Sequence, residues 1–199
     1  CLTAALVLAF AGLSPRFGLM VVGYVALSTA YSFYLKRLLF LDVLLLAGLY
    51  TYRLLAGAVA IDGVVSEWLL AMSVFFFLCL AVLKRYAELR QMPTDATPNP
   101  ARGYRAQDAA VLGVLGPVCA YVSVLVFTLY INSAKVQQLY PRPLLLWLIC
   151  PLLLQGLTRL WLLGHRGVVD DDPLLFALRD RQSQVLAVAA VAIAVAAAV

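Results

Sequence analysis

Residues 109–134 read AAVLGVLGPVCAYVSVLVFTLYINSA and carry no charged side chain. A helix that crosses the hydrocarbon core of a membrane needs about 20 predominantly apolar residues, so this run is long enough to span it. The whole chain shares this character, because 64% of its 199 residues are hydrophobic and only 13% are charged. A soluble domain is about 45–50% apolar and about 25% charged. The composition therefore predicts an all-α integral membrane protein, and it excludes a soluble enzyme, a disordered tail and a nucleic-acid-binding domain.

Charged and loop-forming residues divide the rest of the chain into further apolar runs. We expect seven membrane-spanning helices, at residues 1–15, 17–35, 41–61, 67–84, 109–134, 143–164 and 183–199. A kink is expected at Gly116-Pro117, since proline removes a helical hydrogen bond. These spans form one transmembrane helical domain over residues 1–199. Because the chain opens on Cys1 inside an apolar run, without a basic leader, we expect it to be truncated at its N-terminus.

Lysine and arginine are distributed unevenly between the two ends of these spans. Ten fall at one end, namely Lys36, Arg37, Lys84, Arg85, Arg90, Arg102, Arg105, Arg166, Arg179 and Arg181. Three fall at the other end, namely Arg16, Lys135 and Arg142. Cytoplasmic loops of membrane proteins are rich in Lys and Arg, so the first end is predicted to face the cytoplasm. The same bias accounts for the net charge of +5 without a nucleic-acid partner.

The first polar cluster is YSFYLKR at residues 31–37, followed by Asp42. One interpretation is a helix end whose cations extend to the membrane surface. The other is a phosphate-binding Lys36 that is oriented by Tyr31. Asp42 begins an apolar span and therefore needs a partner. Both interpretations stay open on this segment alone.

Arg53 stands inside the third apolar span, 11 residues after Asp42. That spacing corresponds to about 16 Å along a helix and returns to nearly the same face. An arginine in mid-span costs about 2.5–3.5 kcal/mol on insertion scales, so we expect it to face the bundle interior or a wet cavity and to be paired. It either forms an ion pair with an acidic residue of a neighbouring helix or binds an anion at the floor of a cavity.

Residues 84–90, KRYAELR, form the polar end of the fourth span. Glu88 follows Lys84 by four residues and Arg85 by three, the spacing of ion pairs on an exposed helix end. The same spacing offers two cations that could bind phosphate and a carboxylate that could bind Mg²⁺. The loop that holds Arg102 is a weaker signal, because a basic loop beside a membrane often serves topology or anionic lipid.

Together these segments resemble the UbiA superfamily of intramembrane prenyltransferases, and within it the polyprenyl-phosphate phosphoribosyltransferase branch. The matching segments, in family order, are YSFYLK (31–36) with Asp42, RLLAG (53–57), KRYAEL (84–89) and FALRDR (176–181). The family fold has nine helices around a lipid-open cavity, with its active site at the cytoplasmic end. The resemblance implies a UbiA-like bundle in which the seven spans correspond to the third through ninth helices.

The resemblance further implies a Mg²⁺-dependent transferase of the bacterial inner membrane. Its lipid substrate would be a polyprenyl phosphate, and its phosphorylated sugar donor would be phosphoribosyl pyrophosphate. The implied catalytic residues are Lys36, Lys84, Arg85 and Glu88, of which Glu88 is also the candidate metal ligand. The implied substrate-binding residues are Tyr31, Asp42, Arg53, Arg102 and Arg179. Assembly into a homo-oligomer stays open.

Two departures from the family pattern bear on activity. The first acidic motif, N-D-x-x-D-x-x-x-D, carries the family's main Mg²⁺–diphosphate site and is absent, so we expect this chain alone to be inactive. The second acidic motif is replaced by KRYAE at 84–88, which favours a donor with an additional phosphate. Two alternatives remain: an aromatic-acceptor prenyltransferase that uses prenyl diphosphate, and a non-enzymatic membrane protein, either a transporter or a degenerate subunit.

Overall fold

The computed structural model describes residues 15–61, 63, 66–91, 103–169 and 172–199, and within them the chain is helical with no strand. The α-helices are α2 (Pro15–Phe33), α3 (Leu41–Ala60), α4 (Glu67–Arg90), α5 (Ala109–Ile131), α6 (Ala134–Leu139), α7 (Ile149–His165), α8 (Pro173–Arg179) and α9 (Arg181–Ala198). Three short 3₁₀ helices are η1 (Leu35–Arg37), η2 (Ala106–Asp108) and η3 (Pro143–Leu148).

Five of these helical segments are long and apolar enough to cross a membrane, namely Leu41–Ala60, Glu67–Arg90, Ala106–Ile131, Pro143–His165 and Arg181–Ala198. They confirm the prediction of an all-α membrane bundle. The span expected at 17–35 corresponds to α2, which forms a helix of 19 residues but is not among the five. The span expected at 1–15 lies outside the described residues, apart from its last residue.

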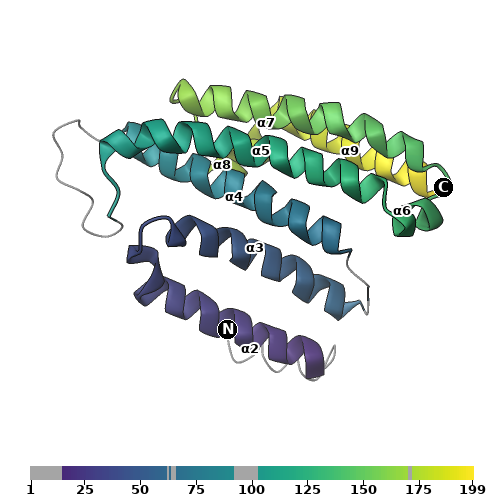
Figure 1. Ribbon diagram of the computed structural model, residues 1–199, viewed down its shortest axis with the longest axis horizontal. Helices are drawn as coiled ribbons and strands as arrows, with labels where there is room; N and C mark the ends of the chain where they lie inside the picture. The colour runs from purple at the N-terminus through teal and green to yellow at the C-terminus, as the bar shows by residue number, and fades with distance from the viewer. Residues whose placement is uncertain (1–14, 62, 64–65, 92–102, 170–171) are drawn as a thin grey trace.

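The long helices run antiparallel to their neighbours in the chain, and α4 lies near the middle of the bundle (Figure 1). α4 packs against α3 on one side and α5 on the other, and α7 packs against α5. α9 contacts α7, α8 and η3, whereas α2 packs mainly against α3 and η1. The fully buried side chains include Leu83 and Val82 of α4 and Ile131 of α5, so the core follows α4 and α5.

Small residues let α5 approach its neighbours closely, as is common between membrane helices. A Cβ atom added to Gly116 would lie 1.8 Å from Cζ2 of Trp161, and one added to Gly113 would lie 3.0 Å from Cε2 of Tyr86. α5 remains a single helix through Pro117, the residue at which we expected a kink. The glycines therefore admit two large aromatic rings, one from α4 and one from α7.

The antiparallel order brings one set of helix ends together, at the left of Figure 1. The starts of α3, α5 and α9 meet the ends of α4 and α7 there, together with η1, η2 and α8. The described members of the predicted cation-rich set lie in these elements or directly beside them. The candidate site is built at this end.

Candidate functional site

The site begins where α3 begins. Phe40 precedes the helix with a φ of 65°, a conformation that is uncommon for residues other than glycine. Its backbone N–H donates to the hydroxyl of Tyr104 at 3.1 Å, which fixes this turn. Asp42 follows in the first turn of α3, where the helix dipole favours a negative charge. Its carboxylate is completely buried, so it requires charged or hydrogen-bonding partners.

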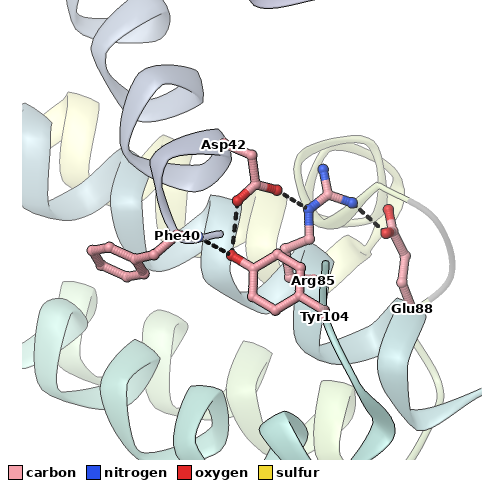
Figure 2. Close-up of polar contacts among 5 residues, drawn as sticks. All are labelled: Phe40, Asp42, Arg85, Glu88 and Tyr104. Atoms are coloured by element: carbon pink, nitrogen blue, oxygen red, sulfur yellow. Dashed lines mark hydrogen bonds and ion pairs between the residues drawn. The ribbon is translucent and has the colours of Figure 1, made fainter. Parts of the chain in front are cut away.

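Arg85 of α4 is the cationic partner that Asp42 needs. Its Nε atom donates to Oδ2 of Asp42 at 2.7 Å, and its side chain is only 3% exposed. Its Nη1 atom donates to Oε2 of Glu88, one turn further along α4. Figure 2 shows the guanidinium lying between the two carboxylates, with Asp42 on one side and Glu88 on the other. Arg85 therefore links α3 to α4 and is neutralised from both sides.

Tyr104 closes the network from the segment that precedes α5. Its hydroxyl donates to Oδ1 of Asp42 at 2.7 Å, and the residue is 3% exposed. Burial, together with the hydrogen bond to the Asp42 carboxylate, raises the pKa of Tyr104 well above its ordinary value of about 10. The phenol thus stays protonated and keeps donating. The sequence patterns did not single out Tyr104, and the one available signal was an aromatic residue in the basic loop beside Arg102.

Two further predicted residues lie beside this network. The phenol of Tyr31, on α2, interacts with the Arg85 guanidinium and is within electrostatic range of Asp42 and Glu88. Lys84 neighbours Arg85 in the chain, and its Nζ atom lies 3.9 Å from Oδ2 of Asp172. Asp172 also accepts hydrogen bonds from the backbone at the start of α8. The fold thus gathers Tyr31, Asp42, Lys84, Arg85 and Glu88 at one end of the bundle.

Two other predicted site residues, Lys36 and Arg179, make none of the contacts described above. Lys36 is in η1 and is partly buried, and Arg179 is the exposed last residue of α8. Arg102 lies outside the described residues. The roles expected for these three residues remain predictions.

Arg53 lies beside a cavity, one of its two expected environments, but its partners are tyrosines. It is exposed rather than facing the bundle interior, and its Nε atom donates to the hydroxyl of Tyr24 at 2.8 Å. Its guanidinium carbon also lies 5.0 Å from the ring centre of Tyr24 and 5.2 Å from that of Tyr50. These phenols are suitable partners, because aromatic faces attract cations, and no acidic partner of Arg53 occurs among the described residues. Arg53 lines a cavity of about 290 Å³ between α2 and α3.

The network is rich in charge, but its carboxylates do not form a metal site by themselves. No group of three or more His, Cys, Asp or Glu residues that could hold a metal occurs within the described parts of the chain. Both Asp42 and Glu88 direct a carboxylate oxygen to Arg85.

Comparison with known proteins gives partial matches. No protein-family model matches the chain. It is 37% identical over 174 residues to the uncharacterized protein y4nM of Sinorhizobium fredii, an alignment that covers 86% of this chain and 34% of that protein. It is 33% identical over 164 residues to the nodulation protein NoeC of Azorhizobium caulinodans, covering 81% of this chain and 53% of NoeC.

A third match concerns a shorter part of the chain. Decaprenyl-phosphate phosphoribosyltransferase of Mycolicibacterium smegmatis is 36% identical over 78 residues, which is 39% of this chain and 24% of that protein. The chain thus spans about a third of y4nM, about half of NoeC and about a quarter of the mycobacterial protein. It is a multi-helix membrane bundle that is similar, over part of its length, to a decaprenyl-phosphate phosphoribosyltransferase.

Proposed function

We propose that this chain is part of an intramembrane transferase of the UbiA superfamily that acts on polyprenyl phosphate. The observation that carries the proposal is the Asp42–Arg85–Glu88 network, with Lys84 beside it, at one end of a bundle of apolar helices. A reaction between a water-soluble phosphorylated donor and a membrane-bound acceptor needs a polar site at the end of apolar helices. The partial similarity to decaprenyl-phosphate phosphoribosyltransferase supports the same class of reaction.

The most specific form of the proposal is phosphoribosyl transfer from phosphoribosyl pyrophosphate to polyprenyl phosphate. An oxygen of the lipid phosphate forms a bond to the anomeric carbon of the ribose, and the bond from that carbon to pyrophosphate breaks. Negative charge develops on the leaving pyrophosphate, and cations placed there lower the barrier. We assign Lys36, Lys84 and Arg85 to this task.

Glu88, Tyr31 and Arg53 have supporting roles in this proposal. Glu88 would contact the ribose hydroxyls, and Tyr31 and Arg53 would shape the cavity. Mg²⁺, if the reaction uses it, would need carboxylates besides those of the described network, because Asp42 and Glu88 are both engaged by Arg85. The site would face the cytoplasm of a bacterial cell at its inner membrane, on the basis of the Lys and Arg distribution.

The deciding experiment is a transfer assay on the whole protein, reconstituted in lipid nanodiscs. One arm supplies labelled phosphoribosyl pyrophosphate with polyprenyl phosphate, and the other supplies labelled prenyl diphosphate with an aromatic acceptor. We expect labelled lipid in the first arm. Product in the second arm alone would replace the proposal by an aromatic prenyltransferase. Transmembrane flux of label without a covalent product would favour a transporter.

Lys84→Ala tests the cation assignment. We expect this substitution to lower the transfer rate by about 10²-fold, the size of effect seen when one electrostatic contact to a transition state is removed, while the protein stays folded. Lys135→Ala is the matched control, because Lys135 is exposed in α6 at the opposite end of the bundle. Turnover of Lys84→Ala equal to that of Lys135→Ala would remove Lys84 from the proposed phosphate site.

A further inference from the structure

Two adjacent cations of α4 each meet a carboxylate that is only partly buried. Arg85 contacts Glu88, whose side chain is 31% exposed, and Lys84 lies near Asp172, whose side chain is 32% exposed. These are the two cations that we assign to the donor's phosphates. In the structure their outer sides face carboxylates of the same chain.

The two sides of the Arg85 guanidinium differ in how easily their partners could leave. Asp42 is fully buried and is also held by the hydroxyl of Tyr104 at 2.7 Å. Removing it from Arg85 would leave an unpaired charge in the protein interior, which is strongly unfavourable. Glu88 contacts Arg85 from one turn further along α4, and its side chain is 31% exposed, so a dissolved anion can reach it. Arg85 therefore has one anchored side and one exchangeable side.

In the Lys84–Asp172 pair, the lysine is the side chain that can move away. The Asp172 carboxylate is fixed by the backbone N–H groups of Leu174 and Leu175, at 3.0 and 3.4 Å. The distance of 3.9 Å from Lys84 Nζ exceeds that of a hydrogen bond. A lysine side chain is a flexible stem with a compact charge, so Lys84 can swing away from Asp172 without disturbing the start of α8.

We propose that Glu88 is a displaceable internal counter-ion, which occupies the outer side of Arg85 until the diphosphate group of a substrate takes its place. The inference rests on the proposed function for the identity of that substrate. On binding, a phosphate oxygen accepts the hydrogen bond that Nη1 of Arg85 now gives to Glu88, and Lys84 turns toward the same anion. Asp42 and Tyr104 keep Arg85 in position throughout the exchange.

This role predicts the opposite sign from a metal-binding role for Glu88. A counter-ion competes with the anion, so removing its charge strengthens anion binding. A metal ligand recruits the anion through Mg²⁺, so removing its charge weakens anion binding when Mg²⁺ is present. The sign of the change in affinity therefore identifies the role.

The experiment measures the affinity of inorganic pyrophosphate for the whole protein in nanodiscs of zwitterionic lipid, by isothermal titration calorimetry with EDTA and again with Mg²⁺. Glu88→Gln keeps the shape of the side chain and removes its charge. We expect it to bind pyrophosphate about two- to fivefold more tightly, the range that a partly exposed ion pair would account for. Glu67→Gln is the matched control, because it removes an exposed carboxylate from the first turn of α4, at the other end of the same helix. We expect that variant to bind as the wild type does.

Three results would overturn the inference: Glu88→Gln binding no more tightly than Glu67→Gln, binding more weakly, or losing a Mg²⁺-dependent gain in affinity. Glu88→Ala must change the affinity in the same direction as Glu88→Gln. The transfer assay separates this inference from the proposed function. Tighter pyrophosphate binding without any transfer supports the counter-ion role and refutes the transferase. Transfer without tighter binding in Glu88→Gln refutes the counter-ion role and keeps the transferase.

Discussion

Two arginines of the bundle form ion pairs with an aspartate, and the two pairs differ in their surroundings. Arg85 and Asp42 join α4 to α3, with side chains that are 3% and 0% exposed. Arg159 of α7 and Asp180 meet at the start of α9 through two hydrogen bonds, of 2.6 and 3.1 Å, with side chains that are 24% and 18% exposed. The first pair is shielded from solvent, whereas water can reach the second.

The surroundings decide what each pair does. Asp180 also caps α9, accepting from the backbone N–H and the hydroxyl of Ser183 at 2.8 Å each, so it mainly ends one helix and begins another. The side chain of Asp42 does not cap α3. It instead holds Arg85 and Tyr104 beside the candidate site. The same ion-pair chemistry thus fixes a helix start in one place and positions a cation in the other. Substitutions should separate the two cases by the size of their effects.

Asp42→Ala is expected to have the largest effect. It leaves Arg85 buried without the partner on its inner side, and removing one member of a buried ion pair costs about 3–5 kcal/mol. Equilibrium unfolding in mixed micelles measures this loss. The double substitution Asp42→Leu with Arg85→Met removes both charges and should recover most of the stability. A single variant as stable as the wild type would show that water reaches this pair after all.

Tyr104→Phe comes next. It keeps the ring but removes the donor to Asp42 and the acceptor for the Phe40 N–H, and unsatisfied buried groups of this kind cost about 1–3 kcal/mol. The same unfolding measurement applies. Tyr121→Phe is the control, because its hydroxyl contacts Thr158 at 3.1 Å at an exposed position. Equal losses of unfolding free energy in the two variants would contradict a structural role for the buried hydroxyl of Tyr104.

The long helices and the cation-rich end of the bundle could be predicted from the sequence, since long apolar runs and the Lys and Arg distribution carry that information. The short helices α6 and α8 were not predicted. The sequence also indicated that Asp42 needs a partner. It did not identify that partner as Arg85. To choose the partner of Asp42 among the cations of the chain, one must know how α3 is rotated about its axis relative to α4. Nearly uniform apolar helices have too little periodicity to define that rotation.

The contacts of Tyr104 and Arg53 could not be predicted from the sequence either, for a related reason. Tyr104 contacts Asp42 across 62 positions of sequence, from a segment without helical periodicity. Arg53 was expected to face the interior or a wet cavity, paired with an acidic residue or with a bound anion, because insertion costs penalise a lone charge. Tyr24 and Tyr50 instead surround it at an exposed position. A pattern of charged residues alone does not indicate that tyrosine side chains can be the partners of an arginine.

Asp180→Ala is expected to lower the unfolding free energy less than Asp42→Ala or Tyr104→Phe. Loss of an N-cap typically costs about 1 kcal/mol, and a partly exposed ion pair adds less than about 1 kcal/mol to that. Asp180→Asn separates the two contributions, because asparagine caps a helix about as well as aspartate but carries no charge. We expect the asparagine variant to unfold within about 1 kcal/mol of the wild type. A loss as large as that of Asp42→Ala would remove the distinction between the two pairs.

Acidification tests the same distinction through the smallest expected effect. The hydrogen bond from Arg159, aided by the Ser183 N–H, lowers the pKa of Asp180 below its ordinary value. An unfolded chain would protonate this carboxyl near its ordinary value of about 3.9. A lowered pKa in the folded state means that the contribution to stability is complete above about pH 4 and is lost as the pH falls toward 2. The Asp180→Asn variant lacks this carboxyl, so its unfolding free energy should fall less steeply than that of the wild type between pH 4 and 2. Identical slopes for the two proteins in that window would mean that the carboxylate of Asp180 gains nothing from Arg159, and that only its capping bonds hold the start of α9.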